Sequence, residues 1–302
     1  MSSLKKIVIA SLVSLTYLSA DVLTLIPYIG AIKYDNSLTK SFKDNASFLG
    51  LETSIGDNGY LLEVAYRYTT INYKESLNLQ NLKQHDLSMV YNAKYSSYAL
   101  KLGAHYINNN EATSFKDLGS GYIGIAGLKG YDYFDEDKFT YGVDAYYSVY
   151  PDAHDDTTSS YTQLIDIVQF TPYIEYSMVF NPSTRNDVTL KVNAIASTQY
   201  KDPGYLSFEL QDTFVYENFF AIAKVFGGEM KSGVIDGGVQ VINTKDLHTS
   251  SFSGKVGYYI APTLALDVSY AMNYYQEYNA ATLTLSPEGQ NSVGIVSLSY
   301  SY

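Results

Sequence analysis

The residue types best suited to acid–base chemistry gather in one acidic segment, Asp152-Ala153-His154-Asp155-Asp156. A carboxylate beside an imidazole can orient the ring as a general base that activates water. Motifs of only a few residues also arise by chance, so the pattern alone does not define an active site. The favoured interpretation is a solvated acidic loop or one that attracts divalent cations, and a hydrolase is the rival.

The remaining histidines carry a weaker catalytic signal. His85 precedes Ser88 by three residues, His105 shares the expected strand face of Lys101, and His248 falls in a long polar connector. None of them has the sequence context of an activated nucleophile, and no cluster has the ligand spacing of a zinc site. The chain has 0 Cys, so it has neither thiol chemistry nor disulfides. We expect no enzymatic activity and no cofactor.

A second set of polar residues recurs at alternate positions of otherwise apolar segments. In 60–74, Glu63 and Arg67 lie on the opposite face from Val64 and Tyr66, because side chains alternate along a strand. Glu63 and Arg67 are expected to neutralise part of each other's charge. The charged residues expected on such polar faces are Glu63, Arg67, Lys101, Asp144, Lys191, Lys224, Lys255 and Asp267. They would line a charged, water-filled pore or, alternatively, pair across strands and rigidify a closed lumen.

Alternating segments of this kind recur along the whole chain and predict an all-β, antiparallel up-and-down barrel of about fourteen strands. Twelve or sixteen strands are the alternatives, sixteen if 239–243 and 282–285 are also strands. Pro172 predicts a sheet edge or a bulge, because proline cannot donate to a ladder. The expected strands are 22–34, 45–56, 60–74, 82–95, 97–108, 119–130, 138–150, 161–180, 187–200, 204–217, 218–230, 251–260, 263–277 and 291–302.

The connectors between these segments fall into two classes. Those after even-numbered strands are mostly short: 57–59, 96, 131–137, 181–186, 217–218 and 261–262. Those after odd-numbered strands are mostly long and polar: 35–44, 75–81, 109–118, 151–160, 201–203, 231–250 and 278–290. Membrane barrels combine short turns at one end with long loops at the other. The longest connector, 231–250, is expected to fold inward and narrow the lumen.

The first twenty residues predict export. Lys5 and Lys6 form a basic start, 7–18 is a short apolar run, and Leu18-Ser19-Ala20 ends on a small residue suited to cleavage. The apolar run is too short for a stable transmembrane helix. We therefore expect a signal peptide at 1–20 and a single barrel domain at 21–302.

The last strand alternates apolar or aromatic residues with serines. Its apolar positions are Val296, Leu298, Tyr300 and Tyr302. A terminal strand of this type resembles the C-terminal assembly signal of Gram-negative outer-membrane β-barrel proteins. The resemblance implies an outer-membrane location, contact with membrane lipid and lipopolysaccharide, and recognition of this strand by the barrel-assembly machinery. The acidic segment around His154 resembles one element of the omptin outer-membrane proteases.

Composition narrows the partners. The formal net charge of −11 argues against nucleic acid and favours cations or neutral solutes. The 32 Tyr suit membrane–water interfaces, since tyrosine joins an apolar ring to a polar tip. A soluble secreted β-sandwich rich in tyrosine is the alternative that composition leaves open. The sequence also leaves open whether the protein is a homo-oligomer.

Across nearly the whole mature chain, this architecture resembles the porin-like outer-membrane proteins. The resemblance implies passive diffusion of small hydrophilic solutes or ions. The rivals are an omptin-like protease using Asp152 and His154, and a non-conducting barrel that acts in adhesion or envelope integrity through its loops. Hydrophobic-solute transporters of the same strand number carry an N-terminal plug, for which a first strand at 22–34 leaves no room.

Overall fold

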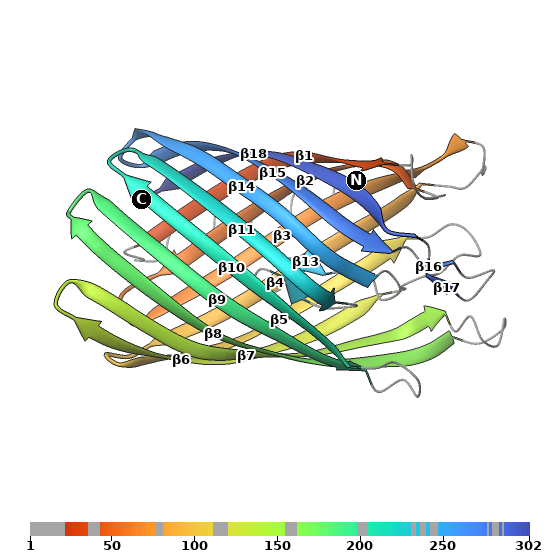
Figure 1. Ribbon diagram of the computed structural model, residues 1–302, viewed down its shortest axis with the longest axis horizontal. Coiled ribbons are helices and arrows are strands. Elements are labelled where there is room, and N and C mark those ends of the chain that lie inside the picture. The colour runs from red at the N-terminus through yellow and green to blue at the C-terminus, as the bar shows by residue number, and fades with distance from the viewer. Residues whose placement is uncertain are drawn as a thin grey trace.

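The chain forms one closed antiparallel β-barrel (Figure 1). The wall consists of fourteen long strands, each hydrogen-bonded to its neighbours in chain order, and the first strand pairs with the last. The computed structural model describes residues 22–35, 43–75, 81–110, 120–154, 162–197, 204–230, 234–235, 240–241, 247–276, 278–279, 284–285 and 287–302. The expected signal peptide lies outside these residues.

The wall strands are β1 (Val22–Asp35), β2 (Lys43–Gly56), β3 (Tyr60–Tyr73), β4 (Leu82–Lys94), β5 (Tyr98–Asn110), β6 (Gly121–Phe134), β7 (Asp137–His154), β8 (Thr162–Asn181), β9 (Thr184–Ser197), β10 (Tyr205–Tyr216), β11 (Phe219–Met230), β14 (Leu247–Ala261), β15 (Leu264–Gln276) and β18 (Gly289–Ser301). Two separate hairpins are formed by β12 (Val234–Ile235) with β13 (Gln240–Val241), and by β16 (Tyr278–Asn279) with β17 (Thr284–Leu285).

The predicted fourteen-stranded barrel is confirmed. The counts of twelve and sixteen are wrong. Sixteen required wall strands at 239–243 and 282–285, whereas the described parts of these segments belong to the two small hairpins. Two connectors are shorter than expected, because the strands run on to within two residues of each other: only 135–136 separate β6 from β7, and only 182–183 separate β8 from β9.

Closure of the barrel depends on the pairing of β1 with β18. The two strands are antiparallel and in register from Thr24 opposite Ser301 to Asp35 opposite Gln290. Beyond that register, Leu23 and Tyr302 exchange both backbone hydrogen bonds, with N···O distances of 3.0 and 2.8 Å. A closed sheet has no edge, so its backbone groups are satisfied without water.

The two faces of the wall differ in polarity. On β15, Leu266 and Val268 are 43% and 50% exposed on the outside, whereas the intervening Asp267 is 5% exposed on the inside. The residues predicted as the assembly signal, Val296, Leu298, Tyr300 and Tyr302, are likewise exposed. A soluble sandwich would bury its apolar faces against each other, so that alternative is excluded. The outward apolar face is the one that a barrel presents to lipid. Recognition of the last strand during assembly stays a prediction.

Among the described residues, no helix has the length and apolarity needed to cross a membrane.

The short turns are built by local polar contacts and by left-handed backbone. In the β2–β3 turn, the side-chain Oδ1 of Asp57 accepts hydrogen bonds from the backbone N–H groups of Gly59 and Tyr60, at 2.6 and 3.0 Å. The first residues of two other turns, Asp135 and Glu217, adopt positive φ angles of 55° and 49°. Such turns match the twist of the flanking strands, and they collect at one end of the barrel (Figure 1).

The expectation at Pro172 is wrong. This residue lies opposite Val143 in the β7–β8 ladder, and the registers on both sides of β8 continue past it without a shift. Thr171 and Pro172 have no paired residues on β9, but the register is the same before and after them. A long ladder therefore accommodates one proline, which lacks an N–H donor, without a bulge.

Removing Tyr300–Tyr302 should lower the yield of folded barrel several-fold, because Leu23 and its neighbours lose their backbone partners at the seam. The fraction that migrates as folded protein in unheated denaturing gels measures this yield. Tyr302→Phe, which keeps the backbone bonds and the ring, is the control and should fold as well as the unchanged chain. Equal yields for the truncated and unchanged chains would contradict the role of the seam.

Candidate functional site: the barrel lumen

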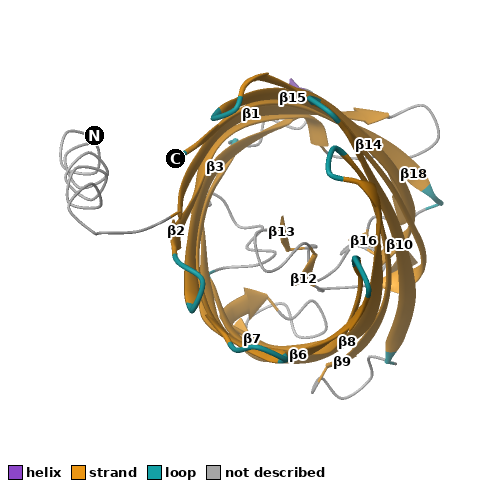
Figure 2. Cartoon of the chain, turned by 90° about the vertical axis from the view of Figure 1, so that its left-hand side faces the viewer, coloured by secondary structure: helices purple, strands orange, loops and turns teal. Residues whose placement is uncertain are grey.

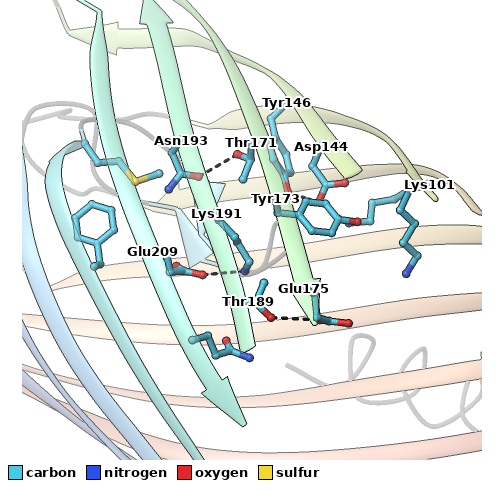
Figure 3. Close-up of a pocket in the computed structure, with 14 residues that line it drawn as sticks. Lys101, Asp144, Tyr146, Thr171, Tyr173, Glu175, Thr189, Lys191, Asn193 and Glu209 are labelled. Carbon is cyan, nitrogen blue, oxygen red and sulfur yellow. Dashed lines mark hydrogen bonds and ion pairs between the residues drawn. The ribbon is translucent and has the colours of Figure 1, made fainter. Parts of the chain in front are cut away.

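The charged residues predicted to line a pore all lie on the inner face of the wall. Lys101, Asp144 and Lys191 border a cavity of about 310 Å³ between β5 and β11 (Figure 3). A second cavity, of about 480 Å³, lies along the wall from β10 and β11 through β14, β15, β18, β1 and β2 to β3. Four of the predicted residues border it: Arg67, Lys224, Lys255 and Asp267. Their role in conduction stays a prediction.

Glu63 and Arg67 do not neutralise each other as expected. Residues four apart in a strand are separated by roughly 13 Å of backbone rise, so their partners are on the neighbouring strand. Arg67 lies opposite Asp86, and both Nε and Nη2 donate to its Oδ2 at 3.1 Å. Glu63 instead accepts a hydrogen bond of 2.8 Å from the amide of Asn92.

Lys101 and Asp144 form an ion pair that passes over an intervening strand. Lys101 is opposite Gly127 of β6, and Gly127 is opposite Asp144 of β7. The Nζ–Oδ2 distance is 2.7 Å. A Cβ atom on Gly127 would collide with Oδ1 of Asp144. The absence of a side chain at Gly127 therefore permits this pair.

Glu209 holds two lysines at once. Its Oε1 lies 2.8 Å from Nζ of Lys191, directly opposite on β9, and its Oε2 lies 3.0 Å from Nζ of Lys224 on β11. The carboxylate is buried, at 4% exposure. One carboxylate between two ammonium groups leaves this cluster with one net positive charge.

Lys255 and Asp267 form a looser pair on the opposite part of the wall. Their Nζ–Oδ1 distance is 3.5 Å, and the same oxygen accepts a hydrogen bond of 2.5 Å from the hydroxyl of Ser297. The ion pairs of the lumen thus lie on neighbouring or nearly neighbouring strands. Each acid is held by at least one donor.

Neutral polar side chains that the sequence analysis did not single out complete the inner wall. The hydroxyl of Thr171 donates to Oδ1 of Asn193 at 3.0 Å (Figure 3). The amide of Gln169 donates to the same oxygen at 3.4 Å. The amide of Asn193 in turn donates to Ser207 at 3.3 Å. These residues occupy inward positions of the alternation, so the strand pattern was the signal that could have identified them.

The three histidines outside the acidic segment contact other described residues. His105 is fully buried inside, with Nε2 3.6 Å from Oδ1 of Asp86. Nδ1 of His85 and the hydroxyl of Tyr66 form a hydrogen bond of 2.8 Å. The ring of His248 stacks on that of Tyr275, with their centroids 5.8 Å apart. Within the described ranges, no group of three or more His, Cys, Asp or Glu could hold a metal ion.

The acidic segment itself falls at the end of β7. Asp152 and His154 belong to that strand, but their side chains are not described, and Asp155 and Asp156 lie outside the described residues. The omptin-like arrangement therefore stays a rival prediction.

An apolar cluster occupies the inner face toward the end with the long connectors, where the sequence analysis expected polar residues. Its buried members are Val90, Ile107, Ile123, Ile125, Tyr146, Tyr150, Ile167, Ile195, Phe226 and Met230. The β12–β13 hairpin lies inside the barrel outline in both the side view and the view along the axis (Figures 1 and 2). Part of the inner wall is therefore apolar, and a short segment of the chain lies inside the barrel.

No protein-family model and no curated protein sequence matches the chain. Solved structures match its fold. The CymD monoaromatic hydrocarbon channel matches with a TM-score of 0.53 at 12% identity, covering 95% of this chain and 90% of that one. The Pseudomonas putida toluene transporter TodX also matches with a TM-score of 0.53, at 9% identity, covering 95% and 91%. Barrels named as transporters of hydrophobic solutes therefore share this architecture, contrary to the expectation from the sequence.

The closed wall, the outward apolar face and these likenesses agree on the class of protein. In architecture, the chain is a Gram-negative outer-membrane β-barrel.

Gly127→Ala should break the Lys101–Asp144 pair, because the added methyl group occupies the position of Asp144 Oδ1. Losing a hydrogen-bonded charge pair costs about 1.5–3 kcal/mol, which urea titration of the refolded barrel would measure. Gly124→Ala is the matched control: it lies on the same strand with its nearest neighbour, the carbonyl of Tyr147, 3.9 Å from the new Cβ. If both variants unfold at the same urea concentration, Gly127 has no such role.

Proposed function

We propose that this protein is a passive outer-membrane channel for small hydrophilic solutes and ions. The observation that carries the proposal is the polar inner wall: charged and amide side chains border two cavities, and Gln211 borders both. A barrel of this strand number is wider than the eight-stranded barrels that side chains alone can fill. Solutes would cross by diffusion along this wall.

Pairing of the lumen charges suits such a role. An unpaired charge in a narrow pore binds counter-ions strongly, whereas conduction requires that binding be weak enough for release. In the described lumen, Arg67 faces Asp86 and Lys101 faces Asp144. The wall thus offers hydrogen bonds to a passing solute while its own charges are largely compensated.

A second candidate is a channel for small apolar molecules. The specific observation in its favour is the inward apolar cluster around Ile123 and Phe226. The likeness in fold to a hydrocarbon channel and a toluene transporter is compatible with it. Vesicles containing the protein would separate the candidates: uptake of arabinose without accelerated uptake of toluene supports the first, and the reverse supports the second.

Stepwise conductance of the refolded protein in a planar bilayer tests the proposal. We expect ohmic channels in potassium chloride and a reversal potential in a salt gradient. Protein that is correctly folded, by its migration in unheated gels, but never conducts would contradict the channel and favour a role of the loops.

Replacing 232–245 with a Gly-Ser-Gly-Ser linker should raise the single-channel conductance several-fold. The replaced segment includes the hairpin that lies within the barrel, and a wider lumen carries more ions. The same linker in place of 112–118, another long connector at that end, is the control and should change conductance much less. An unchanged conductance after the first replacement would show that the hairpin does not narrow the path.

Glu209→Gln should shift the reversal potential toward anion preference, because it leaves Lys191 and Lys224 without their shared counter-charge. Glu217→Gln, which removes a carboxylate from a turn, should leave the potential unchanged. A shift of equal size in both variants would indicate that total charge, rather than this cluster, sets the preference.

A further inference from the structure

We propose that the larger cavity of the lumen is a binding site for a small aromatic monocarboxylate. This inference rests on the proposed channel, whose substrate class it names. The cavity measures about 480 Å³, within the range of sites for small organic molecules. Its lining comes from consecutive strands of the wall, from β10 round through β14, β15, β18 and β1 to β3.

The floor of this cavity is made of small side chains. Ala265 and Ser269 of β15 and Ser297 and Ser299 of β18 border it. Because these side chains are short, the wall is hollowed along these two strands. Their hydroxyl groups supply hydrogen-bond donors and acceptors at the bottom of the hollow.

Aromatic rings stand on both sides of the small floor. On one side, Tyr28 and Phe48 meet edge to face, with centroids 6.3 Å apart and planes at 65°. On the other side, Phe220 and Tyr259 have centroids 5.6 Å apart and planes at 56°. Aromatic rings attract one another in offset or edge-to-face arrangements, so a flat ring placed on the floor finds an aromatic partner at the flank beside it.

Glycines hold these rings against the wall. Tyr28 lies over its cross-strand partner Gly50, and Phe220 lies over its partner Gly257. A Cβ atom on either glycine would occupy the position of the ring. The rings therefore lie along the wall, and the space between the two flanks stays open for a ligand.

Charge distinguishes a carboxylate from a neutral or cationic ring. The cavity is bordered by Arg67, Lys224 and Lys255, against Glu52 and Asp267. Asp267 is engaged by Lys255 and Ser297. Lys224 is paired with Glu209, which borders the other cavity and is also paired with Lys191. Arg67 is paired with Asp86, which does not border this cavity. Among the side chains that border the cavity, cations therefore outnumber acids by three to two, in contrast to the acidity of the whole chain.

A ring with one carboxylate satisfies both features. The ring packs against an aromatic flank, and the carboxylate accepts hydrogen bonds from an ammonium or guanidinium group that borders the cavity, the strongest class of hydrogen bond in proteins. A sugar would use the hydroxyl floor without the cations, and a hydrocarbon would use the rings alone.

Isothermal titration of the refolded barrel in lipid nanodiscs tests the inference with benzoate as the probe, against empty nanodiscs as the blank. Acetate carries the charge without the ring, benzyl alcohol the ring without the charge, and benzylamine the opposite charge. We expect saturable binding of benzoate that is at least about tenfold tighter than that of the other three. Equal binding of acetate or benzyl alcohol, or tighter binding of benzylamine, would overturn the proposal.

Two variants assign the binding to this cavity. Lys224→Met leaves Glu209 paired with Lys191, and Phe220→Leu removes one flank; each should weaken benzoate binding at least about tenfold. Lys138→Met is the control, because Lys138 packs over the ring of Tyr131, away from this cavity. Folding of each variant is checked by migration in unheated gels. Binding unaffected by both variants would overturn the proposal.

The same titration separates this inference from the proposed function. If the protein binds benzoate but does not conduct, the site stands and the channel fails. If it conducts in potassium chloride but does not bind benzoate, the channel stands and the substrate class is wrong.

Discussion

The structure depends on one constraint: in a bilayer, every backbone N–H and C=O must find a partner within the protein. The antiparallel ladders between consecutive strands pair the backbone groups of the wall, except those on the outer edges of β1 and β18. Pairing of β1 with β18, which extends to the exchange of backbone bonds between Leu23 and Tyr302, removes those edges. Once the sheet is closed, alternation of side chains decides what faces lipid and what faces the lumen.

Electrostatics organises the inside. Charged groups in a space of low effective dielectric are costly unless they are paired and hydrogen-bonded. The ladder registers bring acids and bases together on adjacent strands, as at Arg67–Asp86 and Lys191–Glu209. Where the partner is two strands away, Gly127 leaves the necessary space. The net charge of −11 therefore says little about the lumen, where Asp86, Asp144 and Asp267 each have a basic partner.

The alternation of side chains was sufficient to predict the strands of the wall, because the pattern has a period of two and each strand is long. It also predicted the inward direction of Glu63, Lys101 and Asp267. Pairing partners were not predictable, since the register between strands is a non-local property. The apolar cluster near Ile123 was missed for a similar reason: its members lie on strands far apart in sequence, and the closed barrel brings them together.

The central claim is that the polar face encloses water and the apolar face meets lipid. Since the chain has 0 Cys, single cysteines report on each position without background. We would place them at Ser269 and Ser299, which border the larger cavity, and at Val268 and Leu298, which are exposed outside. In lipid vesicles, a charged thiosulfonate should modify the first two quickly and the last two hardly at all. Protection of the first pair with modification of the second would contradict the account.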